Sequence, residues 1–430
     1  RGVFTNTVPV DAYRGAGRPE ATYVTERLVE AAAEVTGIDS IELRKINFIQ
    51  PDQFPYNSPG TLTYDSGDYE ATLNSALKSI NYNEFEERKK QSQDNGKLRG
   101  LGISCYIEAC GVAPSKLTLE AGGRGGYYES STVRINPTGS VTVFTGSHSH
   151  GQGHETVFAQ IVHEKLGVAF DSIDVVHGDT GRVPFGVGTV GSRSLAVGGP
   201  ALMRSIDKII DKGKKIAAHL LDTSYDEITF KDGEFSVSNS NKFIAFSDVV
   251  GAAYVPGNYP IETLEPGLEE TSFYDPPNLT YPAGAHICEI EIDPETGQID
   301  IVNYCVSDDF GIVMNPMIVE GQVHGGVAQG IGQALFENCI YEENTAQLIN
   351  GSFMDYTMPR ADNIPNMIVE TEVTPCVHGL GVKGCGEAGA IAAPPAVIHA
   401  ILNALKEKGV NDFDMPATPN KIWHAINNNH

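Results

Sequence analysis

The segment of residues 379–390 reads GLGVKGCGEAGA, and its glycines decide which fold class the chain can have. Gly384, Gly386 and Gly389 spell G-x-G-x-x-G, which in dinucleotide-binding folds follows a strand and opens the helix of a βαβ unit. Here Pro394-Pro395 is expected to interrupt the helix that would have to follow, and no βαβ unit remains downstream. The segment therefore argues against a doubly wound dinucleotide-binding fold.

The same segment holds an isolated acid. Glu387 is the only charged residue between Gly384 and His399, among small and apolar residues. A carboxylate in such a setting loses hydration and suits the task of a general base. A glutamate at the surface or in a salt bridge is the alternative interpretation.

Apolar spacing outward from this segment predicts several helices. Val24, Leu28, Ala31 and Val35 recur on one face of a helix over residues 20–35, and Gly37 is its expected C-cap. Further helices are expected at residues 155–166, 200–221, 321–336 and 395–407.

Strand-like runs between the helices favour hairpins. Hairpins are expected over residues 132–144 and 287–302, and a third turn at 231–234. Because helices and strands are interleaved without a strict βαβ order, the chain is expected to be α+β or mixed α/β. The polar run of residues 86–97 is the expected boundary, which gives domains over 1–90 and 98–430.

Composition excludes several classes of protein. The 430 residues carry a net charge of −25, which disfavours nucleic-acid binding, and 41% hydrophobic residues are too many for a disordered acidic chain. No segment is expected to span a membrane, and no signal peptide is recognised. Seven widely spaced cysteines without C-x-x-C predict no disulfide framework or metal cage, and a cytoplasmic location.

Four more glycine-rich loops stand out among the 46 glycines. Backbone N–H groups in such loops and at helix N-termini can hold an anionic ligand in an acidic chain. The first loop, residues 12–19, carries Arg14 and Arg18, whose alternative role is that of solvent-facing side chains. The second, residues 146–155, contains Gln152 and three histidines. The histidine spacing is not that of a helical zinc pair, so a zinc hydrolase using His148, His150 and His154 is a minor alternative.

The remaining two loops also have structural alternatives. The third, residues 186–194, places hydroxyls beside Arg193, which fits a phosphate cradle or a flexible surface loop. The fourth, residues 320–332, puts Gln322, Gln329 and several glycines along a helix face. Because glycine disfavours helix, this pattern predicts close approach of a ligand or of another helix.

Taken together, the five loops resemble those of the molybdenum hydroxylases, the family of xanthine dehydrogenase, aldehyde oxidase and carbon monoxide dehydrogenase-like enzymes. The resemblance covers nearly the whole chain, as the C-terminal half of the subunit that binds the molybdenum cofactor. It implies the α+β fold of that family, with glycine-rich loops around a buried molybdopterin in the cytosine dinucleotide form. No protein side chain would bind the molybdenum.

The resemblance also implies residue roles. Glu387 looks like the family's base, and Tyr13, Ala16, Tyr127 and Tyr128 are candidates for the substrate pocket. The residues similar to the family's cofactor-binding positions are Ala12, Arg14, Gly15, Gly151, Gln152, Gly153, His154, Gly191, Ser192, Arg193, Ser194, Gln322, Gln329, Cys385 and Gly386.

The implied reaction hydroxylates an aldehyde or an N-heteroaromatic carbon with oxygen from water. Electrons would leave through iron–sulfur clusters to FAD on partner chains. The family's Gly-Gly-Phe-Gly loop does not occur here, so the N-terminal half of the subunit is expected to be supplied by another chain or piece. A non-catalytic cofactor-binding or assembly subunit is the alternative function.

Two departures from the family bear on the substrate. Carbon monoxide dehydrogenases carry Cys-Ser-Phe-Arg after Ala-Tyr-Arg, whereas this chain has Gly15-Ala16-Gly17-Arg18. Without that cysteine a copper–sulfur bridge cannot form, which argues against carbon monoxide oxidation. Xanthine dehydrogenases carry Phe at the position of Ala16, so a purine substrate is also disfavoured.

Overall fold

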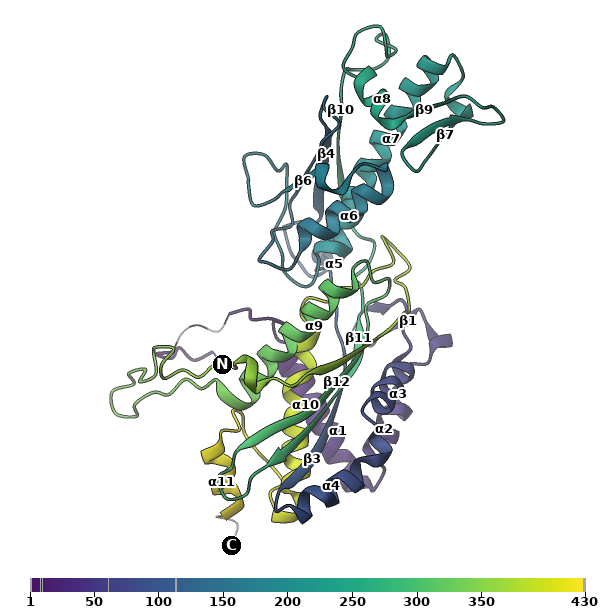
Figure 1. Ribbon diagram of the computed structural model, residues 1–430. Helices are drawn as coiled ribbons and strands as arrows, with labels where there is room; N and C mark the ends of the chain where they lie inside the picture. Colours follow the sequence, from purple (N-terminus) through teal and green to yellow (C-terminus); the bar gives the residue numbers. More distant parts are fainter. Residues whose placement is uncertain (1, 8, 10, 61, 113, 428–430) are drawn as a thin grey trace. The chain divides into compact units, whose positions relative to one another are not determined.

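The chain folds into two compact α+β units in a computed structural model that describes residues 2–7, 9, 11–60, 62–112 and 114–427. Unit 1 comprises Arg1–Ala109, Tyr281–Cys376 and Cys385–His430, and unit 2 comprises Cys110–Thr280 and Val377–Gly384. The α+β fold class expected from the sequence is confirmed. Figure 1 labels most of the helices and strands of the two units.

Unit 1 is built on a four-stranded sheet in the order β13-β12-β11-β3 (Figure 1). The strands are β3 (Leu98–Ile107), β11 (Ala283–Ile292), β12 (Ile299–Asp309) and β13 (Met367–Glu372). β11 pairs antiparallel with both β3 and β12, and β12 pairs parallel with β13. The hairpin expected over residues 287–302 is thus present as β11 and β12.

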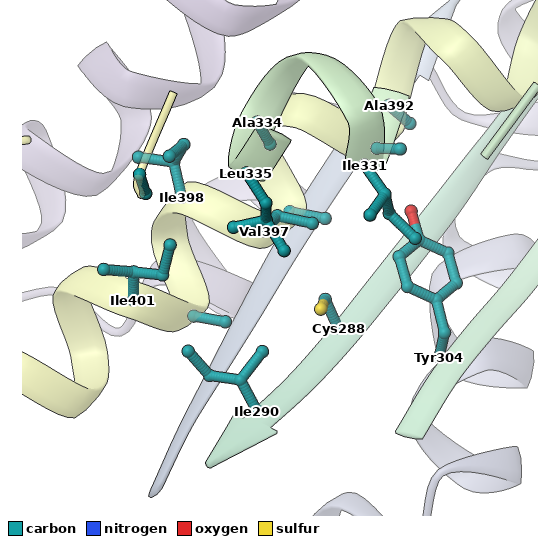
Figure 2. Packing of buried hydrophobic residues seen from close by; sticks show 14 of the residues in the cluster. Cys288, Ile290, Tyr304, Ile331, Ala334, Leu335, Ala392, Val397, Ile398 and Ile401 are labelled. Atoms are coloured by element: carbon teal, nitrogen blue, oxygen red, sulfur yellow. The ribbon is translucent and has the colours of Figure 1, made fainter. Parts of the chain in front are cut away.

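Alternating residues of this sheet serve two cores. Figure 2 shows one face, where Cys288 and Tyr304 meet the helices α9 (Pro316–Ile331) and α10 (Ala388–Leu405). On the other face Ile287 and Cys305 pack against residues such as Leu73 and Phe85. That face is covered by α2 (Ser40–Asn47), α3 (Tyr69–Ser79) and α4 (Phe85–Asp94). The two cores fix the sheet from both sides, so α10 cannot shift without disturbing packing on β3 and β11.

The helix α10 corrects an expectation from the sequence. It begins directly after Glu387 and runs through Pro394 and Pro395 without a break. Proline normally breaks a helix interior, but here Pro394 packs against α9 at Gly330, where an added Cβ would lie 2.9 Å from the proline Cδ. Tertiary packing therefore outweighs the local preference.

The same helix is unusually apolar. Ala388–Lys408 is long and apolar enough to span a bilayer, so the expectation that no segment approaches this length does not hold. However, 89% of its apolar window is buried within the protein. This burial is that of a core helix, and no other helix of the described residues meets the same criteria.

The helix α1 (Arg18–Thr36) matches the expected range and ends at Gly37, but its apolar face is not in the core. Val24, Leu28 and Val35 are 58%, 65% and 87% exposed. α1 buries Pro19 and Glu26 instead, and Glu26 accepts a hydrogen bond of 2.5 Å from the buried Arg44 of α2. Tyr23 packs against the core of unit 1, so this side of α1 faces inward and the apolar stripe faces outward.

The polar segment of residues 86–97, the expected domain boundary, is largely helical. It forms most of α4 and leads into β3, so that the chain on both sides of it belongs to unit 1. Three smaller elements complete unit 1: β1 (Tyr56–Asn57), β2 (Thr63–Tyr64) and α11 (Pro419–Asn427). The assignment of residues 1–90 to a domain completed elsewhere stays a prediction.

Unit 2 contains a four-stranded sheet in the order β10-β4-β5-β6 and a smaller sheet β7-β8-β9. The first has β4 (Glu129–Ile135), β5 (Val141–Thr145), β6 (Ile173–Val176) and β10 (Leu268–Tyr274). The second has β7 (Ile228–Lys231), β8 (Glu234–Val237) and β9 (Phe243–Ala245). The helices are α5 (Ser115–Glu120), α6 (His154–Leu166), α7 (Gly199–Leu221) and α8 (Phe246–Ala252). The expected hairpin over residues 132–144, the turn at 231–234 and the helices α6 and α7 are confirmed.

Candidate functional site

In unit 1, one guanidinium joins three segments that lie far apart in the sequence. Arg14 Nε donates to the carbonyl of Gly386, and Nη1 donates to Gln329 Oε1 at 3.1 Å. Nη2 donates to both the carbonyl and the side-chain oxygen of Gln322, at 3.1 and 3.0 Å. Gln329 Nε2 in turn donates to the Tyr13 hydroxyl at 2.8 Å. The first loop, α9 and the Gly386 segment are therefore held together as one constellation.

Glu387 lies in this constellation at the start of α10. Its Oε1 accepts the N–H of Gly15 at 3.0 Å, and its Oε2 lies 4.0 Å from Arg18 Nη1. The Glu387 side chain is only 13% exposed. The acid is thus shielded from bulk water as the sequence predicted, and it also faces a cation, as the alternative interpretation held.

The backbone at Gly15 explains how this approach is possible. Gly15 has φ +97°, and a Cβ there would lie 2.5 Å from Pro19. Arg18 donates to the carbonyls of Gly15 and Ala109 at 3.1 and 2.6 Å, which fixes the turn from the other side. Glycine is therefore required where the chain passes over the carboxylate.

Cys385, beside this acid, is not a thiolate. Burial raises the pKa of the Cys385 thiol to about 12, and the negative charge of Glu108 adds to the effect. The nearby Arg14 guanidinium lowers this pKa but does not offset the burial. Without a metal ion beside it, Cys385 is therefore a neutral thiol at neutral pH.

The glycines of α9 serve two purposes. Gly326 packs on α10, since an added Cβ would lie 2.9 Å from the Cα of Gly389, and Gly330 packs on Ala393 and Pro394. Helix packing, one of the two interpretations, is the reason for these two glycines. Gly325 instead faces Arg14, with 3.3 Å between an added Cβ and Nη1.

In unit 2, the second glycine loop precedes α6. Gly151 and Gly153 have φ of +94° and +78°, and Gln152 accepts the N–H of His150. Burial lowers the pKa of His154 to about 4, so its imidazole is neutral at pH 7. The nitrogens of His148, His150 and His154 do not gather within the reach of one metal ion. The zinc alternative therefore has no support among the described residues.

The residues of the third loop, 186–194, differ in burial and in their hydrogen bonds. Gly191 is buried, Ser192 is half-buried with φ +51°, and Ser194 Oγ lies 2.8 Å from Thr189 Oγ1. Arg193 is fully buried and bonds 2.8 Å to Glu129, which is also fully buried. Sequence reasoning missed Glu129, because nothing local distinguishes it from an exposed strand residue.

The candidate pocket side chains fall in both units. Tyr13 and Ala16 are exposed in unit 1, and Tyr13 reaches Gln329. In unit 2, Tyr127 is exposed, and Tyr128 stacks on Phe185 with 4.5 Å between ring centroids. Ala12 is exposed, and its N–H donates to Asp11 Oδ1 at 2.7 Å.

The chain matches two sequence profiles that are both described as molybdopterin cofactor-binding domain. One profile matches residues 75–365 and the other residues 1–48. The chain belongs to the molybdopterin cofactor-binding domain family. The family expected from the glycine-rich loops is thereby confirmed.

Curated relatives in this family include large chains of oxidoreductases. The chain is 36% identical to the carbon monoxide dehydrogenase large chain of Hydrogenophaga pseudoflava over 99% of its own length and 53% of the relative. It is 34% identical to the nicotine 6-hydroxylase large subunit of Paenarthrobacter nicotinovorans, over 99% and 52%. The chain therefore spans about half the length of the curated relatives it matches.

Solved structures agree in fold. Quinoline 2-oxidoreductase from Pseudomonas putida 86 matches with a TM-score of 0.91 and 35% identity, over 98% of this chain and 53% of that one. The Cu,Mo-CO dehydrogenase matches with a TM-score of 0.90 and 36% identity, over 97% and 53%.

The donor set in unit 1 fits a molybdopterin. Around Glu387 it consists of main-chain groups, two glutamine amides and the guanidinium groups of Arg14 and Arg18. Such a set suits a cofactor that brings the metal's ligands with it, because hard or soft metal ions held directly need carboxylate, imidazole or thiolate groups.

Proposed function

We propose that this chain is part of a molybdopterin-dependent hydroxylase that oxidises an aldehyde or an N-heteroaromatic C–H with water as the oxygen source. The observation that carries the proposal is the placement of Glu387. A shielded carboxylate is held by the Gly15 N–H at 3.0 Å, in a chain of the molybdopterin-binding family. A mere binding or assembly subunit has no need of such an acid.

Each residue of the constellation has a defined task. When bound, the molybdopterin would supply a molybdenum centre that takes up the two electrons removed from the substrate carbon. Glu387 would accept the proton lost by the water-derived oxygen. The Gly15 N–H at 3.0 Å and Arg18 at 4.0 Å hold the carboxylate in place beside the first loop. Arg14 holds Gly386, and with it the start of α10, in register with the first loop.

Cofactor binding is assigned to both units. In unit 1 it falls to Ala12, Arg14, Gly15, Gln322, Gln329, Cys385 and Gly386. In unit 2 it falls to Gly151, Gln152, Gly153, His154, Gly191, Ser192, Arg193 and Ser194. The cofactor is proposed to be the cytosine dinucleotide form. The main-chain N–H groups at the start of α6, after Gly153, suit its pyrophosphate.

The substrate is proposed to be organic rather than carbon monoxide. Position 15 is glycine, so the first loop lacks the cysteine that follows Ala-Tyr-Arg in carbon monoxide dehydrogenases. Relatives named nicotine 6-hydroxylase and quinoline 2-oxidoreductase support an N-heteroaromatic substrate. Tyr13, Ala16, Tyr127 and Tyr128 are the proposed pocket residues.

Partner chains follow from the length of the relatives. We assign the missing half of the subunit to an N-terminal portion, and electron transfer to an iron–sulfur subunit and an FAD subunit. The relatives named as large chains or large subunits support such a complex. The location is proposed to be cytoplasmic.

Replacement of Glu387 by Gln tests the proposal. The E387Q variant should retain its molybdenum and lose turnover of an aldehyde or N-heteroaromatic by at least about 100-fold, because it cannot take up the proton. Glu20→Gln, in an exposed residue of α1, is the matched control and should leave turnover unchanged. Unchanged turnover in E387Q with molybdenum present would favour the assembly subunit.

A further inference from the structure

The buried ion pair of unit 2 lies at the junction of its glycine-rich loops. Arg193 Nη1 donates to Glu129 Oε2 at 2.8 Å, and both side chains are fully buried. Such a pair carries a large desolvation cost, because two charges are removed from water. A buried ion pair adds little net stability to a fold, so the other hydrogen bonds of Arg193 and Glu129 indicate what the pair does.

Glu129 connects β4 to the second loop. Its Oε1 accepts the N–H of Ser130 at 3.0 Å, and its Oε2 accepts the Ser147 hydroxyl at 3.3 Å. Gly146 has no room for a side chain, since an added Cβ would lie 2.0 Å from Glu129 Oε1. The carboxylate therefore fixes the strand end and the first residues of the loop 146–155 together.

Arg193 connects the same point to two more segments. Nη1 also donates to the Gly188 carbonyl at 3.2 Å, and Nη2 donates to the carbonyls of Tyr127 and Tyr128, the latter at 3.3 Å. The four N–H bonds of the two terminal nitrogens are thereby used, and Nε is buried without a hydrogen-bond partner among the described residues. The one donor left is the Nε–H, and because this atom is itself buried, the guanidinium offers no accessible donor to an anion outside this junction.

We propose that Arg193 and Glu129 are positioning residues that set the geometry of the cofactor-binding loops of unit 2, and that the Arg193 side chain is not itself an anion ligand. The inference rests on the proposed function and revises the role given there to Arg193. Contact with the cofactor from this loop then falls to Gly191 and Ser192, whose backbones have φ of +62° and +51°. The pair would also place Tyr127 and Tyr128, which flank it.

The chemistry of the junction requires arginine. A lysine ammonium could keep the charge beside Glu129, but one nitrogen cannot reach the three carbonyls that the planar guanidinium spans. Two uncharged side chains of similar volume would remove the desolvation cost together with the hydrogen bonds. These two changes separate the contribution of the pair to stability from its contribution to loop geometry.

The test compares R193K, E129Q and the double variant E129L/R193M in the full chain within its assembled enzyme. We expect the unfolding temperature of E129L/R193M to lie within a few degrees of that of the parent. Its molybdenum content, and the cytidine nucleotide that it releases on denaturation, should both be at least tenfold lower. R193K should fold and show the same loss. The matched control is R134M/E269L, which removes the exposed ion pair between β4 and β10 and should change neither quantity.

The E129Q variant gives results of opposite sign for the two roles. If Arg193 were an anion ligand, weakening its internal partner would leave retention of the cofactor unchanged or increased. As a positioning residue it requires the Glu129 carboxylate, so E129Q should retain less cofactor. Parent-like retention in R193K and E129Q would overturn the inference, whatever the double variant does.

A second readout is independent of the cofactor. Arg182 lies exposed in the loop between β6 and Arg193, and trypsin cleaves after arginine. R193K and E129L/R193M should be cleaved after Arg182 at least tenfold faster than the parent and the control, because the loop loses its anchor at Gly188. If the parent holds no molybdenum, the proposed function fails, and the cleavage rates still decide the positioning role. Equal cleavage rates in that case would overturn it.

Discussion

His399 of α10 is a buried base whose titration weakens the fold in acid. Its Nδ1 donates to the Ile103 carbonyl at 2.8 Å, and burial lowers the pKa of the imidazole to about 4 from an ordinary 6.5. Between pH 6.5 and 4 the unfolded chain binds a proton that the folded chain does not. Stability is therefore complete above pH 6.5 and falls as the pH falls through this window, by about 3 kcal/mol for this group.

The His399→Asn variant tests this expectation. Asparagine can still donate to Ile103 but does not titrate, so its unfolding free energy should decline less steeply from pH 6.5 to pH 4. Urea unfolding at a series of pH values measures the difference. Parallel curves for the parent and the variant would show that His399 does not carry the effect.

The seven cysteines differ in reactivity for the same physical reason. Burial raises the pKa of Cys305 and Cys385 to about 12, whereas Cys339 is exposed. A disulfide reagent at pH 8 should label one cysteine rapidly in the folded chain, and seven after unfolding. Cys339→Ala should abolish the rapid phase, and rapid labelling that persists in this variant would contradict the assignment.

Residues of the site were predictable where the sequence around them is unusual. Glu387 stands out because it is the only charged residue between Gly384 and His399, and Arg14 because it directly precedes a glycine-rich turn. Glu129 gave no such signal, because its partner Arg193 is 64 residues away and burial of a strand glutamate depends on the complete fold. The role of Arg193 was inferred from its neighbours in the sequence, whereas its contacts are set by tertiary structure.

Among the elements, α9 and α10 meet through their backbones. A Cβ added at Gly389 would lie 2.6 Å from both the carbonyl oxygen of Val323 and the nitrogen of Val327. Neither atom can move without shifting α9, so Gly389→Ala should destabilise unit 1 by about 1–3 kcal/mol. Calorimetric or urea unfolding measures the loss.

The control for this prediction lies on the other helix of the pair, α9. Gly321 of α9 has open space around its added Cβ. Gly321→Ala should therefore stabilise the chain by about 0.5–1 kcal/mol, through better helix propensity. A loss of stability in G321A similar to that in G389A would show that alanine destabilises α9 and α10 wherever it replaces a glycine. That result would contradict the packing argument.

Helix positions were predictable because apolar periodicity and glycine caps are local signals. The ends of α1, α6 and α7 lie within two residues of their expected positions. The start of α10 was not predictable, since Pro394-Pro395 breaks an isolated helix and only contact with α9 holds it here. The periodicity of α1 was correct, but it gave no information on which part of the molecule would cover the apolar face.

At the scale of the molecule, the outward stripe of α1 is the surface most suited to the proposed N-terminal portion. Val24, Leu28 and Val35 are more than half exposed, and the chain spans about half the length of its relatives. Exposed contiguous apolar side chains of this kind are typical of an interface. The remaining half of the subunit is the occupant to which we assign it.

Replacement of Leu28 by Asp tests this surface. Unfolding of the chain should change by less than about 0.5 kcal/mol, because the side chain packs against little within unit 1. Assembly with the N-terminal portion should be lost in sedimentation analysis. Lys89→Asp on α4 is the control for added charge, and assembly retained by L28D would exclude the stripe as the contact.

The bonds that fix Glu387 have a consequence for how the enzyme matures. Arg14, Arg18 and the Gly15 N–H all belong to the polypeptide of unit 1, and so do their acceptors. Folding of the chain alone therefore fixes the orientation of the Glu387 side chain, and binding of the cofactor is not needed to set it. If the proposed function holds, a molybdopterin would enter a site in which Glu387 already has its final orientation.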